Sequence, residues 1–133
     1  MGPKIRGGNR QVMNDLSNHE IVNLLIEHEA AIASLYTAMS LGLPEMKDFW
    51  GRLIREEKAH AEVLRMLQRR LEAGGVFLNT RKFNEAAIRS SIDYIQRQVA
   101  KIATEGITKL RALALALNVE QAMLENELFR VFE

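Results

Sequence analysis

The sequence predicts an all-α fold, an antiparallel bundle of long helices. Apolar residues recur at alternating intervals of three and four over most of the chain, which is the spacing of a helix stripe buried against other helices. Only two prolines occur in 133 residues, and no stretch alternates strictly between apolar and polar residues as a strand would. A chain of this length can form one domain with a hydrophobic core.

The composition excludes several functional classes. The chain is 47% hydrophobic and 26% charged, as soluble globular proteins usually are. A net charge of +1 gives no reason to expect nucleic acid or an anionic membrane as a partner. The absence of cysteine excludes disulfides, thiol nucleophiles and thiolate metal sites. No apolar run approaches the roughly 20 residues of a membrane span, and residues 1–10 lack the apolar part of a signal peptide. We therefore expect a cytoplasmic protein without a membrane segment.

The N-terminal part divides into a tail and a first helix. Residues 1–16 begin glycine-rich and basic, and we expect a flexible tail there, followed by a helical domain over residues 17–133. Ser17 and Glu20 have the spacing of a capping box, which predicts a helix from Ser17 to about Ser40. A single carboxylate, Glu29, interrupts the apolar stripe of this helix. The stripe consists of Val22, Leu25, Glu29, Ile32, Tyr36 and Met39.

The second predicted helix carries the most informative motif. Gly42 and Pro44 mark a short connection, which implies an antiparallel neighbour running to about Ala73. Glu57 and His60 lie three residues apart and so share one face of this helix. A charged group on a buried stripe is costly unless it is paired or binds a metal. The stripe consists of Met46, Trp50, Leu53, Glu57, His60, Leu64, Leu67 and Leu71.

Two further helices are predicted in the C-terminal half. Residues 84–101 carry a purely apolar stripe and are expected to pack without supplying a ligand. Thr108 is a plausible N-cap for a last helix that runs from about Lys109 to the C-terminus. Carboxylates interrupt its predicted stripe at Glu120 and Glu127. That stripe consists of Leu110, Leu113, Leu117, Glu120, Leu124, Glu127 and Val131.

The inward-facing polar residues predict a metal site. If Glu29, Glu57, His60 and Glu120 face one interior, repulsion and burial would raise the pKa values of the carboxyl groups, and a divalent or trivalent cation would remove that cost. Carboxylate and imidazole ligands suit iron or manganese, although affinity alone does not exclude zinc. Each residue also has a simpler explanation, because a buried Glu can bond to a tyrosine and a histidine can be a satisfied core residue. His28 is expected at the margin of the stripe or on the surface.

These motifs resemble the rubrerythrin branch of the ferritin-like superfamily. The similarity lies in Glu29-x6-Tyr36, in Glu57-Lys-Ala-His60-Ala and, more weakly, in Ala-Leu-Asn-Val-Glu120. The resemblance implies an antiparallel four-helix bundle with a di-iron centre. It implies Glu29 and His60 as terminal ligands and Glu57 and Glu120 as bridges, with Tyr36 donating a hydrogen bond to the acids without touching the metal.

The chain departs from the family pattern in its last part. It has no second Glu-x-x-His motif, and Glu127, a possible extra ligand, stands where many relatives carry a tyrosine. Three explanations of the missing motif are open. The sequence is a truncated piece of a longer chain, a partner chain completes the site by two-fold pairing, or only one metal binds. An inner stripe without a partner favours a homodimer or a higher homo-oligomer.

The resemblance implies a function in peroxide or dioxygen reduction coupled to iron oxidation. Without cysteines the chain has no rubredoxin-type centre, so an external electron donor would be needed. Iron storage or delivery by the same site is an alternative, and a helical scaffold or adaptor with a degenerate metal site is another. Nucleic-acid binding is disfavoured because no aromatic residues are interleaved with the basic residues and the overall charge is near neutral. The basic residues concerned are Arg65, Arg69, Arg70, Arg81 and Lys82.

Overall fold

The computed structural model describes residues 2–74 and 84–125 of the chain, with side chains described from residue 18 onward and, in the last helix, as far as residue 122. These residues form four α-helices and one short 3-10 helix, and no strand occurs among them. The helices are α1 (Gly2–Gly42), α2 (Lys47–Glu72), α3 (Glu85–Glu105) and α4 (Lys109–Glu125), with η1 (Pro44–Met46) between the first two. The predicted all-α class is confirmed.

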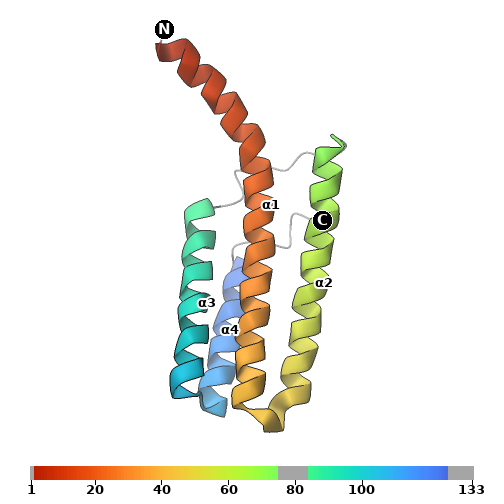
Figure 1. Cartoon of the computed structure of the whole chain (residues 1–133), viewed down its shortest axis with the longest axis vertical. Coiled ribbons are helices and arrows are strands. Elements are labelled where there is room, and N and C mark those ends of the chain that lie inside the picture. Colours follow the sequence, from red (N-terminus) through yellow and green to blue (C-terminus); the bar gives the residue numbers. More distant parts are fainter. Residues whose placement is uncertain (1, 75–83, 126–133) are drawn as a thin grey trace.

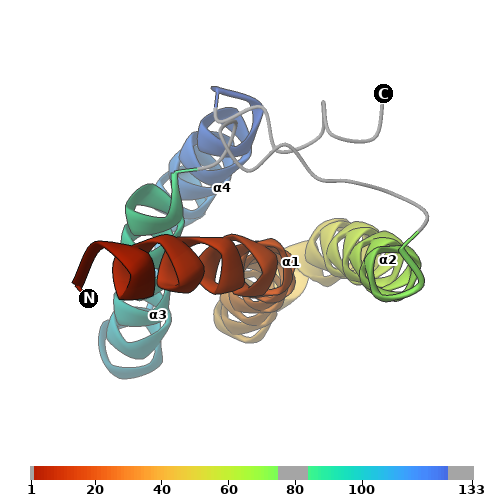
Figure 2. The ribbon, with the colours of Figure 1, turned by 90° about the horizontal axis from the view of Figure 1, so that it is seen from above.

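Helix α1 is the centre of the arrangement. It packs against α2 on one side and α3 on the other, and it also contacts α4 (Figures 1 and 2). The short η1 segment reverses the chain, so α1 and α2 form the antiparallel hairpin that Gly42 and Pro44 predicted. Because α1 is covered from several directions, it supplies the largest share of the buried side chains in the hydrophobic core.

The start of the first helix differs from the prediction. Helix α1 begins at Gly2, so the capping-box residues Ser17 and Glu20 lie inside a helix and do not begin one. Pro3 falls in the first turn, where the missing N–H of proline is tolerated. No proline or glycine follows between Arg10 and Ser17, and each residue added to an existing helix gains a backbone hydrogen bond. The first turns, coloured red in Figure 1, project beyond the other helices.

The ends of the later helices follow local sequence signals. The side chain of Asn84 caps α3 by accepting a hydrogen bond of 3.1 Å from the backbone N–H of Ala87. Helix α3 ends at Glu105, and Gly106 caps it with a φ of 73°, a backbone conformation that residues other than glycine rarely adopt. Thr108 then caps α4, as predicted, by accepting a hydrogen bond of 3.3 Å from the N–H of Arg111.

Burial confirms the predicted stripes of α1, α2 and α3 but not that of α4. The side chains of α4 that face the core are Ala112, Leu115, Ala116 and Val119. The predicted stripe residues Leu110 and Leu117 are instead 79% and 65% exposed. The buried face of α4 is thus built largely from small side chains, and the larger leucines lie on the opposite, exposed face. The face of Leu110, Leu113 and Leu117 is called the leucine face of α4 below.

Candidate metal centre

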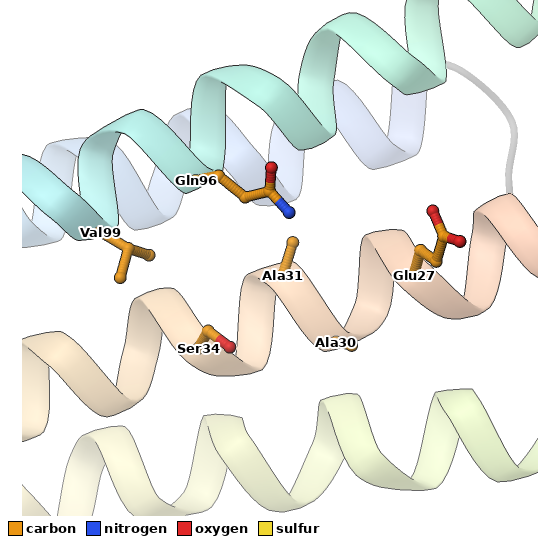
Figure 3. A pocket seen from close by; sticks show the side chains of 6 residues that line it. All are labelled: Glu27, Ala30, Ala31, Ser34, Gln96 and Val99. Atoms are coloured by element: carbon orange, nitrogen blue, oxygen red, sulfur yellow. The ribbon is translucent and has the colours of Figure 1, made fainter.

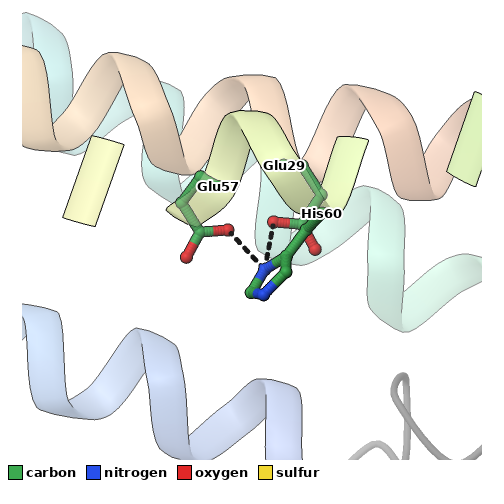
Figure 4. Close-up of side chains that lie close together, drawn as sticks. All are labelled: Glu29, Glu57 and His60. Carbon is green, nitrogen blue, oxygen red and sulfur yellow. Dashed lines mark ion pairs between the residues drawn. The ribbon is translucent and has the colours of Figure 1, made fainter. Parts of the chain in front are cut away.

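Glu29, Glu57 and His60 form a group that could hold a metal ion. Each can offer one ligand atom, and these three atoms lie within 4.8 Å of one another. His60 Nδ1 lies 3.5 Å from Glu57 Oε2 and 3.8 Å from Glu29 Oε2 (Figure 4). These are the distances of ligands arranged around a small ion, and they are longer than hydrogen bonds.

Two helices position this group. Glu57 and His60 lie one turn apart on α2, and Glu29 lies on the facing side of α1. The short η1 connection fixes the register of the two helices. Tyr36 of α1 and Trp50 of α2 pack against each other, with ring centroids 5.8 Å apart, and both are fully buried. The positions of Glu29, Glu57 and His60 therefore depend on packing outside the group itself.

Burial makes the two carboxyl groups costly to ionise. The side chain of Glu57 is 2% exposed and that of Glu29 is 5% exposed. Burial, together with the neighbouring Glu29 and Glu120, raises the pKa of Glu57 to about 10. Burial and the charge of Glu120 also raise the pKa of Glu29, against an opposing effect of its contact with Glu57. In the absence of a cation, at least one of these groups keeps its proton at neutral pH.

Two buried carboxyl oxygens without hydrogen bonds indicate that a cation would fit this group. Oxygen Oε2 of Glu29 and Oε2 of Glu57 are both buried, and neither has a hydrogen-bond partner among the described side chains. Buried polar atoms are nearly always paired. A cation between these oxygens and the imidazole would satisfy both carboxylates and lower the cost of their charge. Hard oxygen donors with one imidazole suit iron, manganese or zinc.

Glu120 lies beside the group but outside it. Its Oε1 accepts a hydrogen bond of 2.7 Å from the hydroxyl of Tyr36. The carboxyl oxygens of Glu120 are not among the three potential ligand atoms that lie within 4.8 Å of one another. Its charge nevertheless raises the pKa values of Glu29 and Glu57. Burial and the bond to Glu120 also raise the pKa of Tyr36, which therefore remains a hydrogen-bond donor. Glu127 falls outside the described residues.

His28 is a core residue on another face of α1. It is buried, and its Nε2 lies 2.8 Å from Ser91 Oγ of α3. Burial lowers its pKa to about 4, so it is neutral at physiological pH. The sequence predicted His28 at the margin of the stripe or on the surface, and this contact with Ser91 was not predicted. A second apolar stripe could have indicated it, since His28 shares a three-to-four spacing with Ile21, Leu24, Ala31 and Leu35.

The exposed side of the group is that of His60. Figure 4 shows Glu57 and His60 directed from α2 toward the space that separates it from α4. Helices α2 and α4 do not pack against each other in the described part of the chain (Figure 2). The side chain of His60 is accordingly 37% exposed, in contrast to its two buried neighbours. Among the described residues, the three members of this group therefore come from α1 and α2 alone.

No protein-family model, curated protein or solved structure matches the chain. None of the helices described is both long enough and apolar enough to cross a membrane. The site is thus defined by its own geometry, as a buried group of two carboxyls and an imidazole that could hold a metal ion.

Proposed function

We propose that the chain is a non-haem iron protein of the rubrerythrin-like, ferritin-like type that reduces hydrogen peroxide or dioxygen. One observation carries this proposal: Glu29, Glu57 and His60 converge, and the carboxyl groups leave buried oxygens without partners. A purely structural helix bundle gains nothing from two such oxygens, whereas a bound cation would pair them. This favours a metal protein over the scaffold alternative.

The residues have distinct tasks in this proposal. Glu29, Glu57 and His60 hold the metal, and the carboxylates must give up their protons as it binds. Glu120 lies within electrostatic reach of the group and is oriented by Tyr36. Bound iron would supply one electron from each of two ferrous ions to hydrogen peroxide, whose O–O bond breaks as two protons are taken up and two water molecules form. Since the chain has no cysteines, an external donor would return the electrons.

A second copy of the chain is proposed to complete the site. The sequence has one Glu-x-x-His motif, and the group is exposed on the side of His60. The apolar residues Phe49, Val63 and Met66 of α2 and the leucine face of α4 are exposed. A two-fold axis beside His60 would bring two such motifs together and cover these residues, because an isologous interface pairs each surface with itself. Two half-sites would then form one two-metal centre.

Metal counting with kinetics tests this function. The protein is loaded with ferrous iron without oxygen, the bound iron is counted, and peroxide or dioxygen is admitted while the near-ultraviolet absorption of ferric iron is followed. We expect retained iron that oxidises rapidly, and its loss in Glu57→Ala. Glu56→Ala is the matched control, since Glu56 is the exposed neighbour on the same helix. Iron binding that is equal in Glu57→Ala and the wild type would support the scaffold alternative.

A further inference from the structure

A second approach to the carboxyl groups lies between α1 and α2. A cavity of about 250 Å³ there is lined by the two buried acids, by small side chains and by two cations. The lining residues are Glu29, Ala30, Ala33, Glu57, Lys58, Ala61 and Arg65. A water molecule occupies about 30 Å³ of liquid, so the cavity has room for several molecules of that size. The buried, unpartnered oxygens of Glu29 and Glu57 belong to the acids that line it.

This cavity does not open on the side of His60. The α2 residues that line it are Lys58, Ala61 and Arg65, and His60 does not contribute. Two positions along an α-helix rotate a side chain by about 200°, so Lys58 lies on nearly the opposite face of α2 from His60. The carboxyl groups are therefore approached from two sides, one beside the imidazole and one between the paired helices.

Side-chain size keeps the second approach open. Ala30 and Ala33 of α1 and Ala61 of α2 form its walls, and no larger apolar residue lines it. Ala61 is buried, Ala33 is half-buried and Ala30 is exposed, and none of them fills the space beside the acids as a larger side chain would. Three alanines around two acids leave a path that one larger side chain would block.

The charges around the cavity select what can pass. Lys58 and Arg65 are exposed, and Arg65 Nη1 is held 3.4 Å from Glu62 Oε2. Two cationic side chains in the lining disfavour the passage of a metal cation, but they do not repel a neutral molecule. The approach beside His60 offers no such pair of cations among its ligand residues.

We propose that the cavity between α1 and α2 is the access route by which a small uncharged oxidant, hydrogen peroxide or dioxygen, reaches the carboxylate site. The metal ion then loads from the side of His60. This inference rests on the proposed function, since an oxidant route has no role in a scaffold. In this proposal Ala30, Ala33 and Ala61 keep the route open because their side chains are small.

Filling the cavity tests the route. In Ala33→Leu a larger side chain occupies the wall, and Ala30→Leu does the same from an exposed position that also lines the cavity between α1 and α3. Ser34→Leu is the matched control, because Ser34 lines the cavity between α1 and α3 (Figure 3) but not the one beside the acids. Circular dichroism and iron counting establish that each variant folds and loads.

The readouts separate access from chemistry. Stopped-flow mixing of the ferrous protein with nitric oxide measures the arrival of an uncharged ligand without turnover, and mixing with peroxide measures oxidation. We expect both bimolecular rates to fall roughly tenfold or more in Ala33→Leu and Ala30→Leu, with iron content and loading rate unchanged.

Ser34→Leu should match the wild type. Wild-type rates in both cavity variants, with normal iron content, would overturn the route alone. A wild-type protein that retains no iron would overturn the proposed function and the route with it.

Discussion

The hydroxyl of Tyr36 on α1 donates a hydrogen bond of 2.7 Å to Oε1 of Glu120 on α4, across 84 residues of sequence. Tyr36 is fully buried, and its ring stacks on that of Trp50, so it is a rigid donor. The bond connects the α1–α2 hairpin, which carries the ligand group, to the last described helix. It also holds Glu120, whose charge acts on the group.

The variant Tyr36→Phe tests the strength of this connection. It removes the donor and leaves a partly buried carboxylate without its partner, so we expect the free energy of unfolding to fall by about 1.5 to 3 kcal/mol. Urea unfolding of the metal-free protein measures the change. Tyr94→Phe is the control, since Tyr94 is exposed on α3. A double-mutant cycle with Glu120→Ala, which removes the acceptor, should show strong coupling, and simple additivity would contradict the assigned bond.

The pKa of Glu57 predicts how the stability of the metal-free protein depends on pH. Burial and the neighbouring acids raise this pKa from 4.5 to about 10. Between these values the folded protein binds more protons than the unfolded chain, so its free energy of unfolding falls as the pH rises. Glu57→Gln removes that ionisation, and we expect it to stabilise the metal-free protein by roughly 1 to 3 kcal/mol at pH 8 while abolishing metal binding.

Thermal unfolding from pH 5 to 9 checks this expectation. The wild type should lose stability toward high pH, and Glu57→Gln should show a flatter profile. Glu56→Gln, which changes the exposed neighbour, should retain the wild-type slope. A wild-type stability that rises steadily over this range would show that Glu57 is ionised in the folded protein.

Metal binding should release protons. Because the pKa values of Glu29 and Glu57 are raised, a cation must displace protons from these groups before it can bind them. We therefore expect affinity to increase with pH, by up to roughly tenfold per unit for each proton released. Calorimetric titration with Mn²⁺ or Zn²⁺ in buffers of different ionisation enthalpy counts the protons. An affinity that does not change between pH 6 and 8 would contradict protonated carboxyl groups at this site.

The sequence predicted the ligand group better than the last helix, and the reason is geometric. The short turn around Pro44 joins α1 and α2, so their two stripes must face each other and Glu29 must lie near Glu57. Helix α4 offers two faces with regular three-to-four spacing, the leucine face and the buried one. Periodicity cannot choose between them, because the choice depends on how closely a neighbour approaches. The contact of His28 with Ser91 likewise depends on the orientation of α3.

His60, which belongs to the group, and His28, which lies on another face of α1, should respond differently to alanine substitution. His60→Ala removes a ligand atom from an accessible position, so we expect weaker metal binding with little change in the stability of the metal-free protein. His28→Ala removes a buried ring and its bond to Ser91, so we expect a loss of about 1 to 3 kcal/mol of stability with metal binding retained. Calorimetry and urea unfolding measure the two effects, and equal losses of metal affinity would refute the ligand assignment.

Pairing of two copies predicts an effect of the leucine face on assembly and metal retention together. Leu117 is 65% exposed, so Leu117→Glu should leave the fold of one chain intact while placing a charge inside the proposed two-fold interface. We expect the variant to be monomeric by light scattering at concentrations where the wild type is dimeric. Its iron should also be held more weakly, because the second Glu-x-x-His would no longer be supplied.

Leu41→Glu provides the matched control for this pairing. Leu41 is also highly exposed, but it lines the groove between α1 and α3 rather than the space beside His60. A wild type that stays monomeric at every concentration would rule out the completed site and leave a single metal per chain. Loss of the dimer in Leu117→Glu with iron retention unchanged would separate assembly from metal binding. Joint loss in Leu117→Glu but not in Leu41→Glu is the result that a shared two-metal centre requires.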